Sequence, residues 1–214
     1  MKVNIFNYLL ICLIIVISSN AKIITNHFLK RTVTYDNSSF EEGLSQECIE
    51  EHDNSEYMEC MPVDKDLDVF KQGCLKIKTE KCQNFFKNPL EYFPHCKNFP
   101  KIQEYYSTNL MKALLIFYEL KCQTDENGNF CPIAEALIKG EGDVSNTCKS
   151  KNCTDTAIKS FQQMDEEFYM ALQNTPFSSG SWSQEEINES KNMVKVLESD
   201  NCRSQHITRL SLRF

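Results

Sequence analysis

The sequence predicts an all-α, disulfide-stapled single domain of about five to six helices. Apolar side chains recur at spacings of three and four residues over most of the chain after residue 48. Runs that alternate between apolar and polar residues, which would indicate strands, are scarce. Ten cysteines follow an N-terminal segment typical of secreted proteins, and an even number of cysteines in that compartment indicates five disulfide bonds.

Residues 1–21 have the parts of a secretory signal peptide. Lys2 precedes an apolar run from Ile5 to Ile17, and small residues lead to a cleavage site after Ala21. The run is shorter than the roughly 20 residues that span a bilayer, which argues against a signal anchor. We therefore expect a secreted, extracellular protein that is free of the membrane after signal removal.

Residues 22–47 are polar and predict a flexible lead-in. The pair Lys30-Arg31 is either a dibasic processing site that releases a propeptide of residues 22–31 or a chance pair. The sequence leaves both alternatives open.

The cysteine-rich helical domain is expected over residues 48–202. Leu67, Phe70, Cys74 and Ile77 follow a helical spacing, and three prolines then form a connector that holds Cys96. The clearest helix is expected over residues 102–121. Its apolar stripe consists of Ile102, Tyr106, Leu110, Ala113, Leu114, Phe117 and Leu120.

A short helix is expected from Pro132 to Ile138. Proline suits the first helical turn, because the backbone N–H that it lacks would have no partner within the helix there. Gly140 and Gly142 follow and are expected to end this helix.

Two further helices are expected before the C-terminus. Thr154 is a candidate cap for a helix that stops near Pro176. Ser183 and Glu186 form a capping box for the last helix, after which Cys202 follows.

The signal peptide carries one cysteine, and the ten that remain are the predicted disulfide residues. They are Cys48, Cys60, Cys74, Cys82, Cys96, Cys122, Cys131, Cys148, Cys153 and Cys202.

Local geometry favours two short bridges, although the sequence does not determine the full pairing. Cys122 and Cys131 flank a loop with a turn signal at Asn127, and Cys148 and Cys153 flank a short polar loop. The alternative is that each of these pairs marks one end of two longer bridges.

The mature chain is acidic. Removal of the signal peptide leaves 22 basic and 30 acidic residues, and a cut after Arg31 would leave 19 basic residues and a net charge of −11. We expect neither nucleic acid nor anionic lipid as a partner, because the charge of both repels this surface. Residues 203–214 form a basic tail with three arginines, as is typical of a solvated terminus.

Three sequons, at Asn37, Asn152 and Asn188, predict N-glycosylation and agree with secretion. Asn152 is the weakest of them, because the middle residue of its sequon is one of the ten cysteines.

Two patterns resemble catalytic or metal sites. Asp125 begins an Asp/Asn-rich run, but the glycine and glutamate of a calcium-binding EF-hand loop are replaced by Phe130 and Ala136, so we expect a simple turn. His52-Asp53 resembles the His-Asp pair of secreted phospholipases A2. The calcium loop of those enzymes is missing upstream, so we expect a solvated acidic face there.

The only tryptophan, Trp182, precedes the predicted cap Ser183. It is expected to pack back on the helix as a hydrophobic staple, and the alternative is that it stacks on a sugar.

The sequence contains no zincin, nucleophile-elbow or phosphate-loop motif, and we expect no cofactor, no metal and no catalytic residue.

The order of the cysteine motifs resembles a family of fungal secreted cysteine-rich proteins of unknown function. The matching segments run from Leu120 to Cys131 and from Asn146 to Cys153, followed by a helix with Phe161 and a last helix that ends at Cys202. The resemblance covers about residues 48–202. It implies a fungal origin and a non-enzymatic surface or secreted role.

These observations predict a secreted, glycosylated protein that binds an unknown extracellular partner, such as cell-wall or host polysaccharide or protein. The alternative is a small secreted hydrolase, either a glycosidase with two convergent carboxylates or a phospholipase-like enzyme. Buried carboxylates in one pocket would favour the hydrolase. Ten paired core cysteines beneath a solvated acidic surface would favour the binding protein.

Overall fold

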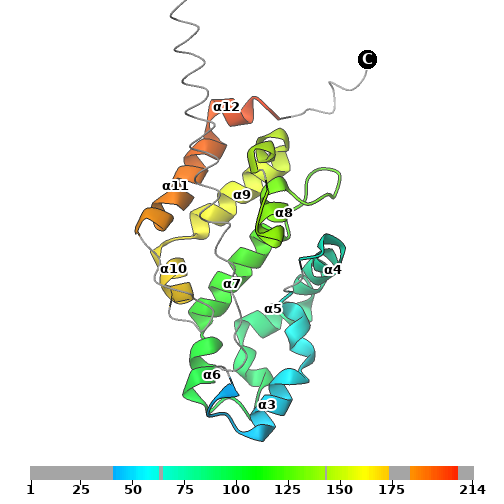
Figure 1. Cartoon of the computed structure of the whole chain (residues 1–214), viewed down its shortest axis with the longest axis vertical. Helices are drawn as coiled ribbons and strands as arrows, with labels where there is room; N and C mark the ends of the chain where they lie inside the picture. The colour runs from blue at the N-terminus through cyan, green and yellow to red at the C-terminus, as the bar shows by residue number, and fades with distance from the viewer. Residues whose placement is uncertain (1–40, 63–64, 143, 174–183, 207–214) are drawn as a thin grey trace, which may run out of the picture.

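The computed structural model describes residues 41–62, 65–142, 144–173 and 184–206 (Figure 1). These residues are mostly helical and contain no strand, and a lone bridge pairs Thr124 with Phe130. All ten cysteines in this part of the chain form disulfides. The prediction of an all-α, disulfide-stapled fold is therefore confirmed.

The first half of the described chain consists of short helices. They are α3 (Gln46–Asp53), η1 (Glu56–Cys60), α4 (Leu67–Ile77), α5 (Glu80–Lys87), η2 (Pro89–Tyr92) and α6 (Pro100–Tyr105). The second half contains the longest helices. Its elements are α7 (Thr108–Lys121), α8 (Pro132–Lys139), η3 (Val144–Lys149), α9 (Lys151–Gln163), α10 (Glu166–Gln173), α11 (Gln184–Glu198) and α12 (Asp200–Arg203).

Side-chain caps start helices in both halves. In each case an oxygen of the cap accepts a hydrogen bond from a backbone N–H of the first turn, which has no partner within the helix. These caps are Ser45 for α3, Asp66 for α4, Thr79 for α5, Ser150 for α9 and Ser199 for α12.

Helix α8 begins at the predicted residue, Pro132, and ends at Lys139, one residue beyond the prediction. Pro132 occupies its first turn, and Gly140 ends it with a φ of 75°, a left-handed conformation that glycine adopts without steric cost.

The single helix predicted over residues 102–121 is wrong. Helix α6 ends at Tyr105 and α7 begins at Thr108, because Ser107 is extended (φ −63°, ψ 147°). The break lets both Tyr105 and Tyr106 point into the core, where each is 2% exposed. A continuous helix would place these two neighbours about 100° apart around its axis.

The helix predicted to begin at Thr154 also differs from the structure. Ser150 is the cap of α9, and Thr154 is buried in its first turn. The chain leaves the helix at Met164, and the Asp165 carboxylate then accepts a hydrogen bond from the N–H of Phe168 (3.0 Å) in α10. The described helices are consequently shorter and more numerous than expected. The Ser183–Glu186 capping box involves residue 183, which lies outside the described residues.

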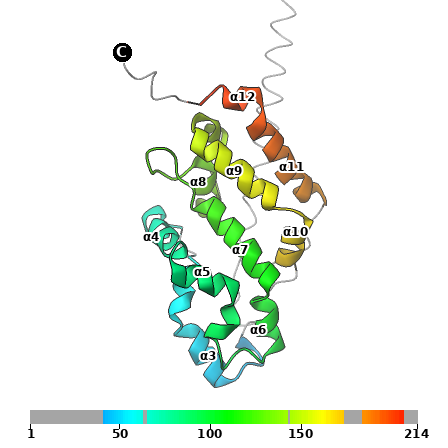
Figure 2. The ribbon, with the colours of Figure 1, turned by 180° about the vertical axis from the view of Figure 1, so that it is seen from behind.

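Helix α7 lies at the centre of an elongated molecule (Figures 1 and 2). Helices α3 and α6 lie at one end of the long axis and α12 lies at the other. One side of α7 contributes Met111 and Tyr118 to a first core, and the other contributes Ala113, Ile116 and Leu120 to a second core.

The chain divides into two regions, which we call the N-terminal region (Cys48–Cys122) and the C-terminal region (Cys131–Cys202). The first core draws mainly on the N-terminal region and the second mainly on the C-terminal region, and α7 contributes to both. Each region has its own disulfides. The bridges of the N-terminal region are Cys48–Cys96, Cys60–Cys82 and Cys74–Cys122, and those of the C-terminal region are Cys131–Cys153 and Cys148–Cys202. No described disulfide joins one region to the other.

The two predicted local bridges, Cys122–Cys131 and Cys148–Cys153, are therefore wrong. The stated alternative holds, since all four cysteines belong to longer bridges. Cys122 lies at the end of α7 beside α4, whereas Cys131 faces the first turn of α9.

Candidate functional site

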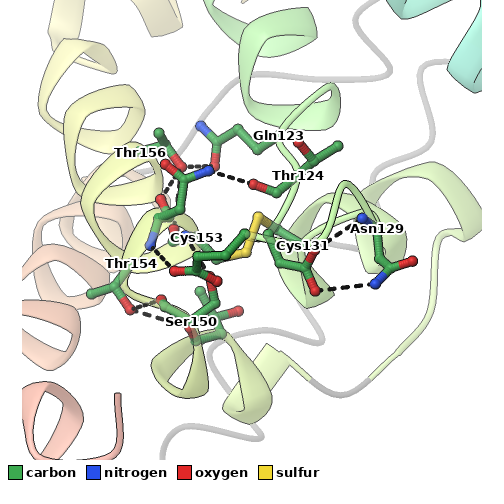
Figure 3. Close-up of a disulfide and its surroundings, with 12 residues drawn as sticks. Gln123, Thr124, Asn129, Cys131, Ser150, Cys153, Thr154 and Thr156 are labelled. Atoms are coloured by element: carbon green, nitrogen blue, oxygen red, sulfur yellow. Dashed lines mark hydrogen bonds between the residues drawn. A yellow bond between two sulfur atoms is a disulfide. The ribbon is translucent and has the colours of Figure 1, made fainter. Parts of the chain in front are cut away.

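The chain between the two regions is a loop of residues 123–130, which we call the junction loop. A disulfide lies directly before and directly after it. Cys122 joins its start to α4 through Cys74. Cys131 joins its end to α9 through Cys153, as Figure 3 shows. Loops that a rigid scaffold holds in place are common binding elements, so this loop is the candidate functional site.

The junction loop is organised around the Asp125 carboxylate. Its Oδ1 accepts hydrogen bonds from the N–H groups of Asn127 (2.8 Å) and Asn129 (2.9 Å). Burial works against ionisation of Asp125, but these hydrogen bonds outweigh it and lower the pKa of this carboxyl. Gly128, with a φ of 82°, donates its N–H to the Asp125 carbonyl (3.1 Å) and completes the predicted turn.

The junction loop is docked on the first turn of α9. The Asn152 side-chain amide donates to the Thr124 carbonyl (2.6 Å), and the Asn152 backbone N–H donates to the Glu126 carboxylate (2.8 Å). The latter bond is the main cause that lowers the pKa of Glu126. A carboxylate at a helix N-terminus is also favoured by the helix dipole.

A buried polar contact reinforces this docking. Gln123 accepts a hydrogen bond from the Thr156 hydroxyl (2.9 Å), as Figure 3 shows. It also donates to the Ser160 hydroxyl (3.1 Å), so both ends of its amide bind to α9. On the opposite side, the Lys71 ammonium of α4 donates to the Gly128 carbonyl (2.9 Å). The junction loop is therefore held by both regions.

Three side chains of the junction loop remain exposed to solvent: Glu126, Asn127 and Asn129. Together they offer a carboxylate and two amides in a fixed arrangement. Such groups form hydrogen bonds with hydroxyl, amide and backbone groups of a partner. Because hydrogen bonds already hold the loop backbone, contact with a polar ligand would cost it little further conformational entropy.

Lys121, directly before Cys122, is a functional candidate that no motif in the sequence indicates. Its ammonium lies 4.8 Å from the ring centre of Phe117 and 5.6 Å from that of Phe70. Burial lowers the pKa of this amine to about 8. The spacing of four residues between Phe117 and Lys121 on one helix is the only signal of this contact in the sequence, whereas the approach of Phe70 depends on the tertiary fold.

His52 is buried, at 4% exposure, and the expectation of a solvated face at this position is wrong. Its ring packs among Phe93, Tyr105 and Tyr106, and burial lowers its pKa. Asp53 beside it is exposed, with 3.5 Å between the histidine Nδ1 and its carboxylate. The described residues contain no group of three potential metal ligands.

Two described carboxylates lie together in a surface recess. A shallow recess between α7 and α10 is lined by Asp165 and Glu167, but both are exposed and Asp165 caps α10. A carboxyl group that donates a proton in glycoside cleavage needs a raised pKa. The resolved pKa shifts of carboxyl groups, at Glu47, Glu59, Asp125 and Glu126, are all downward.

Two of the predicted sequons lie within the described helices. Asn152 is exposed in the first turn of α9, and Asn188 is exposed on α11. The hydroxyl residues of the same sequons, Thr154 and Ser190, are 1% and 2% exposed. Outside the described residues lie Asn37, Ala21, Lys30, Arg31 and Trp182.

Comparisons with known proteins add no relative. Neither a protein-family model, nor a curated protein, nor a solved structure matches this chain. The resemblance to fungal secreted cysteine-rich proteins therefore stays a prediction. Within the described ranges, no helix combines the length and the apolar character needed to cross a bilayer.

Proposed function

We propose that this chain is a secreted, disulfide-stabilised extracellular protein that binds a polar partner through its junction loop, without catalysis. The observation that carries the proposal is the anchoring of this loop by one disulfide at each end. The partner we propose is a cell-wall or host polysaccharide, whose hydroxyl groups suit the exposed amides of the loop.

The state of the cysteines supports the secreted half of the proposal. All ten cysteines of the described chain are paired and at most 8% exposed. Disulfides of this density form in oxidising compartments and are rare in the cytosol. The exposed pocket carboxylates, together with the paired core cysteines, favour a binding protein over a hydrolase.

Secretion is tested by expression of the full chain in a eukaryotic host. We expect intact protein in the medium whose mass shows an N-terminus at Lys22 or Thr32. Alkylation without reduction should add no mass, because five bridges leave no free thiol after loss of the signal peptide. Protein retained in the cell with reduced cysteines would contradict the proposal.

Binding is tested with Asn127→Ala, which removes an exposed amide and keeps the backbone hydrogen bonds of the loop. We expect wild-type protein to sediment with insoluble chitin or β-glucan, and we expect roughly a tenfold weaker affinity for the variant, as loss of one good hydrogen bond would cause. The matched control, Asn98→Ala, removes an exposed amide before α6 and should bind as wild type does. Equal binding by both variants, or none by wild type, would contradict the proposed site.

A further inference from the structure

Folding buries the hydroxyl residue of both sequons in the described fold. Transfer of a glycan needs the asparagine amide and the hydroxyl of the third residue to be accessible together. In the folded protein the Thr154 hydroxyl is buried beside the Ser150 carbonyl (2.9 Å) and the Thr147 carbonyl (3.1 Å). Ser190 is buried against the Tyr169 hydroxyl. Both sites can therefore be glycosylated only before their helices pack.

A disulfide closes one of these sequons and not the other. The middle residue at the first site, Cys153, is completely buried and bonded to Cys131. Its partner precedes it by 22 residues, about 1–4 s of synthesis, and is therefore already present when the sequon emerges. The middle residue at the second site is Glu189, which forms no disulfide.

We propose that Asn152 is a redox-controlled glycosylation site, at which closure of the Cys131–Cys153 bridge competes with glycan transfer. The proposal rests on the secretion proposed above. Asn188 lacks this competitor, so its occupancy is expected to be higher and independent of the bridge.

The two competing reactions have defined chemistry. In bridge closure, the two thiols lose two protons and two electrons to a disulfide of an oxidising folding enzyme, which is reduced to a dithiol. In glycan transfer, the Asn152 amide nitrogen forms a bond to the anomeric carbon of a lipid-linked oligosaccharide. The bond from that carbon to the lipid pyrophosphate breaks, and the amide loses a proton. The bridge draws Cys153 and Thr154 into the buried first turn of α9, which ends access to the acceptor.

A glycan at Asn152 would act on the junction loop directly. The Asn152 amide nitrogen lies 2.6 Å from the Thr124 carbonyl, and the next residue of α9 is joined to the end of the loop. The sugar would therefore lie against the exposed face of the loop. The oxidising strength of the folding compartment would then set the fraction of molecules whose loop is free to bind.

The test measures the occupancy of both sites by mass spectrometry of glycopeptides, in cells and medium together, so that retained protein is counted. We expect wild-type Asn152 to be occupied in a minority of molecules, and we expect Cys131→Ser to raise this occupancy roughly twofold or more, because the competing thiol is absent. Asn188 serves as the internal standard and should not change. Brief treatment of cells that make wild-type protein with dithiothreitol should have the same effect without a substitution.

The matched control is the double variant Cys148→Ser/Cys202→Ser. It removes the other bridge of the C-terminal region but leaves both Cys131 and Cys153 in place. If Asn152 occupancy rises equally in this control, slow folding in general is responsible and the proposal is overturned. Full occupancy in wild type, or none in Cys131→Ser, also overturns it. If Asn188 is unmodified and the signal peptide is retained, the secretion proposal fails instead, and the same variants are then tested behind a host signal peptide.

Discussion

The first core is rich in aromatic rings, whereas the second core has fewer buried rings (Phe161, Phe168 and Tyr169) and more small aliphatic side chains. Phe85 is completely buried and packs against five other rings, with centroid distances between 5.6 and 6.1 Å. The second core instead contains four buried alanines: Ala113, Ala134, Ala136 and Ala157.

The two cores also differ in the helices that border them. Helices α3 and α5 beside the first core have eight residues each, and large rings and three disulfides hold these short helices together. Helices α7, α9 and α11 have 14, 13 and 15 residues, and alanines allow long helices to pack closely along their length. One chain thus builds two cores by two different means.

The largest expected effect is that of Phe85→Ala, which would remove the centre of the aromatic cluster. We expect the free energy of unfolding to fall by about 3–5 kcal/mol, because the ring leaves a cavity that its neighbours cannot fill. Urea unfolding followed by circular dichroism measures this loss. A loss below about 1 kcal/mol would show that the rings are not essential to this core.

Two bridges with the same sequence separation, 22 residues, allow a direct comparison of the regions. The chain-entropy model assigns about 3 kcal/mol to each, so Cys60→Ala/Cys82→Ala should lose about that amount. Cys131→Ala/Cys153→Ala should lose about 1 kcal/mol more, because the hydrogen bonds between Asn152 and the junction loop are released with the bridge. Chemical unfolding of both variants checks the difference. A greater loss in the N-terminal variant would contradict the role assigned to the loop.

The smallest expected effect concerns pH and the N-terminal core. Burial lowers the pKa of His52, so this ring takes up a proton less readily in the folded protein than in the unfolded chain. The free energy of unfolding should therefore fall as the pH falls from about 7 to about 5, below the ordinary histidine pKa. Unfolding curves of wild type and His52→Phe over this range measure the effect. The free energy of unfolding should depend less on pH in the variant than in wild type. If the pH dependence is unchanged, groups other than His52 cause it.

Local signals in the sequence were sufficient for the fold class and for some helix ends. The Pro132 and Gly140 signals placed α8 correctly because they act on the backbone of their own turn. The breaks at Ser107 and Met164 were missed because apolar spacing continues across both. At these points tertiary burial of neighbouring side chains outweighs the helical pattern.

Less of the candidate site than of the fold could be predicted from the sequence. The turn after Asp125 was predicted from local chemistry, but its attachment to α4 and α9 depends on the pairing of Cys122 and Cys131 with distant cysteines. His52 stands among acidic residues in the sequence, and only the fold places it between rings. Disulfide partners and buried polar residues are properties of the tertiary structure, which residue spacing does not encode.

The separation of the disulfides has a consequence for proteolysis. Any single cut within Cys48–Cys122 or within Cys131–Cys202 leaves the two pieces joined by at least one bridge. Among the described bridges, none spans residues 123–130, so one cut there would leave two polypeptides that only non-covalent packing holds together. The hydrogen bonds that dock the junction loop on α4 and α9 therefore also protect the segment that links the two regions from a protease.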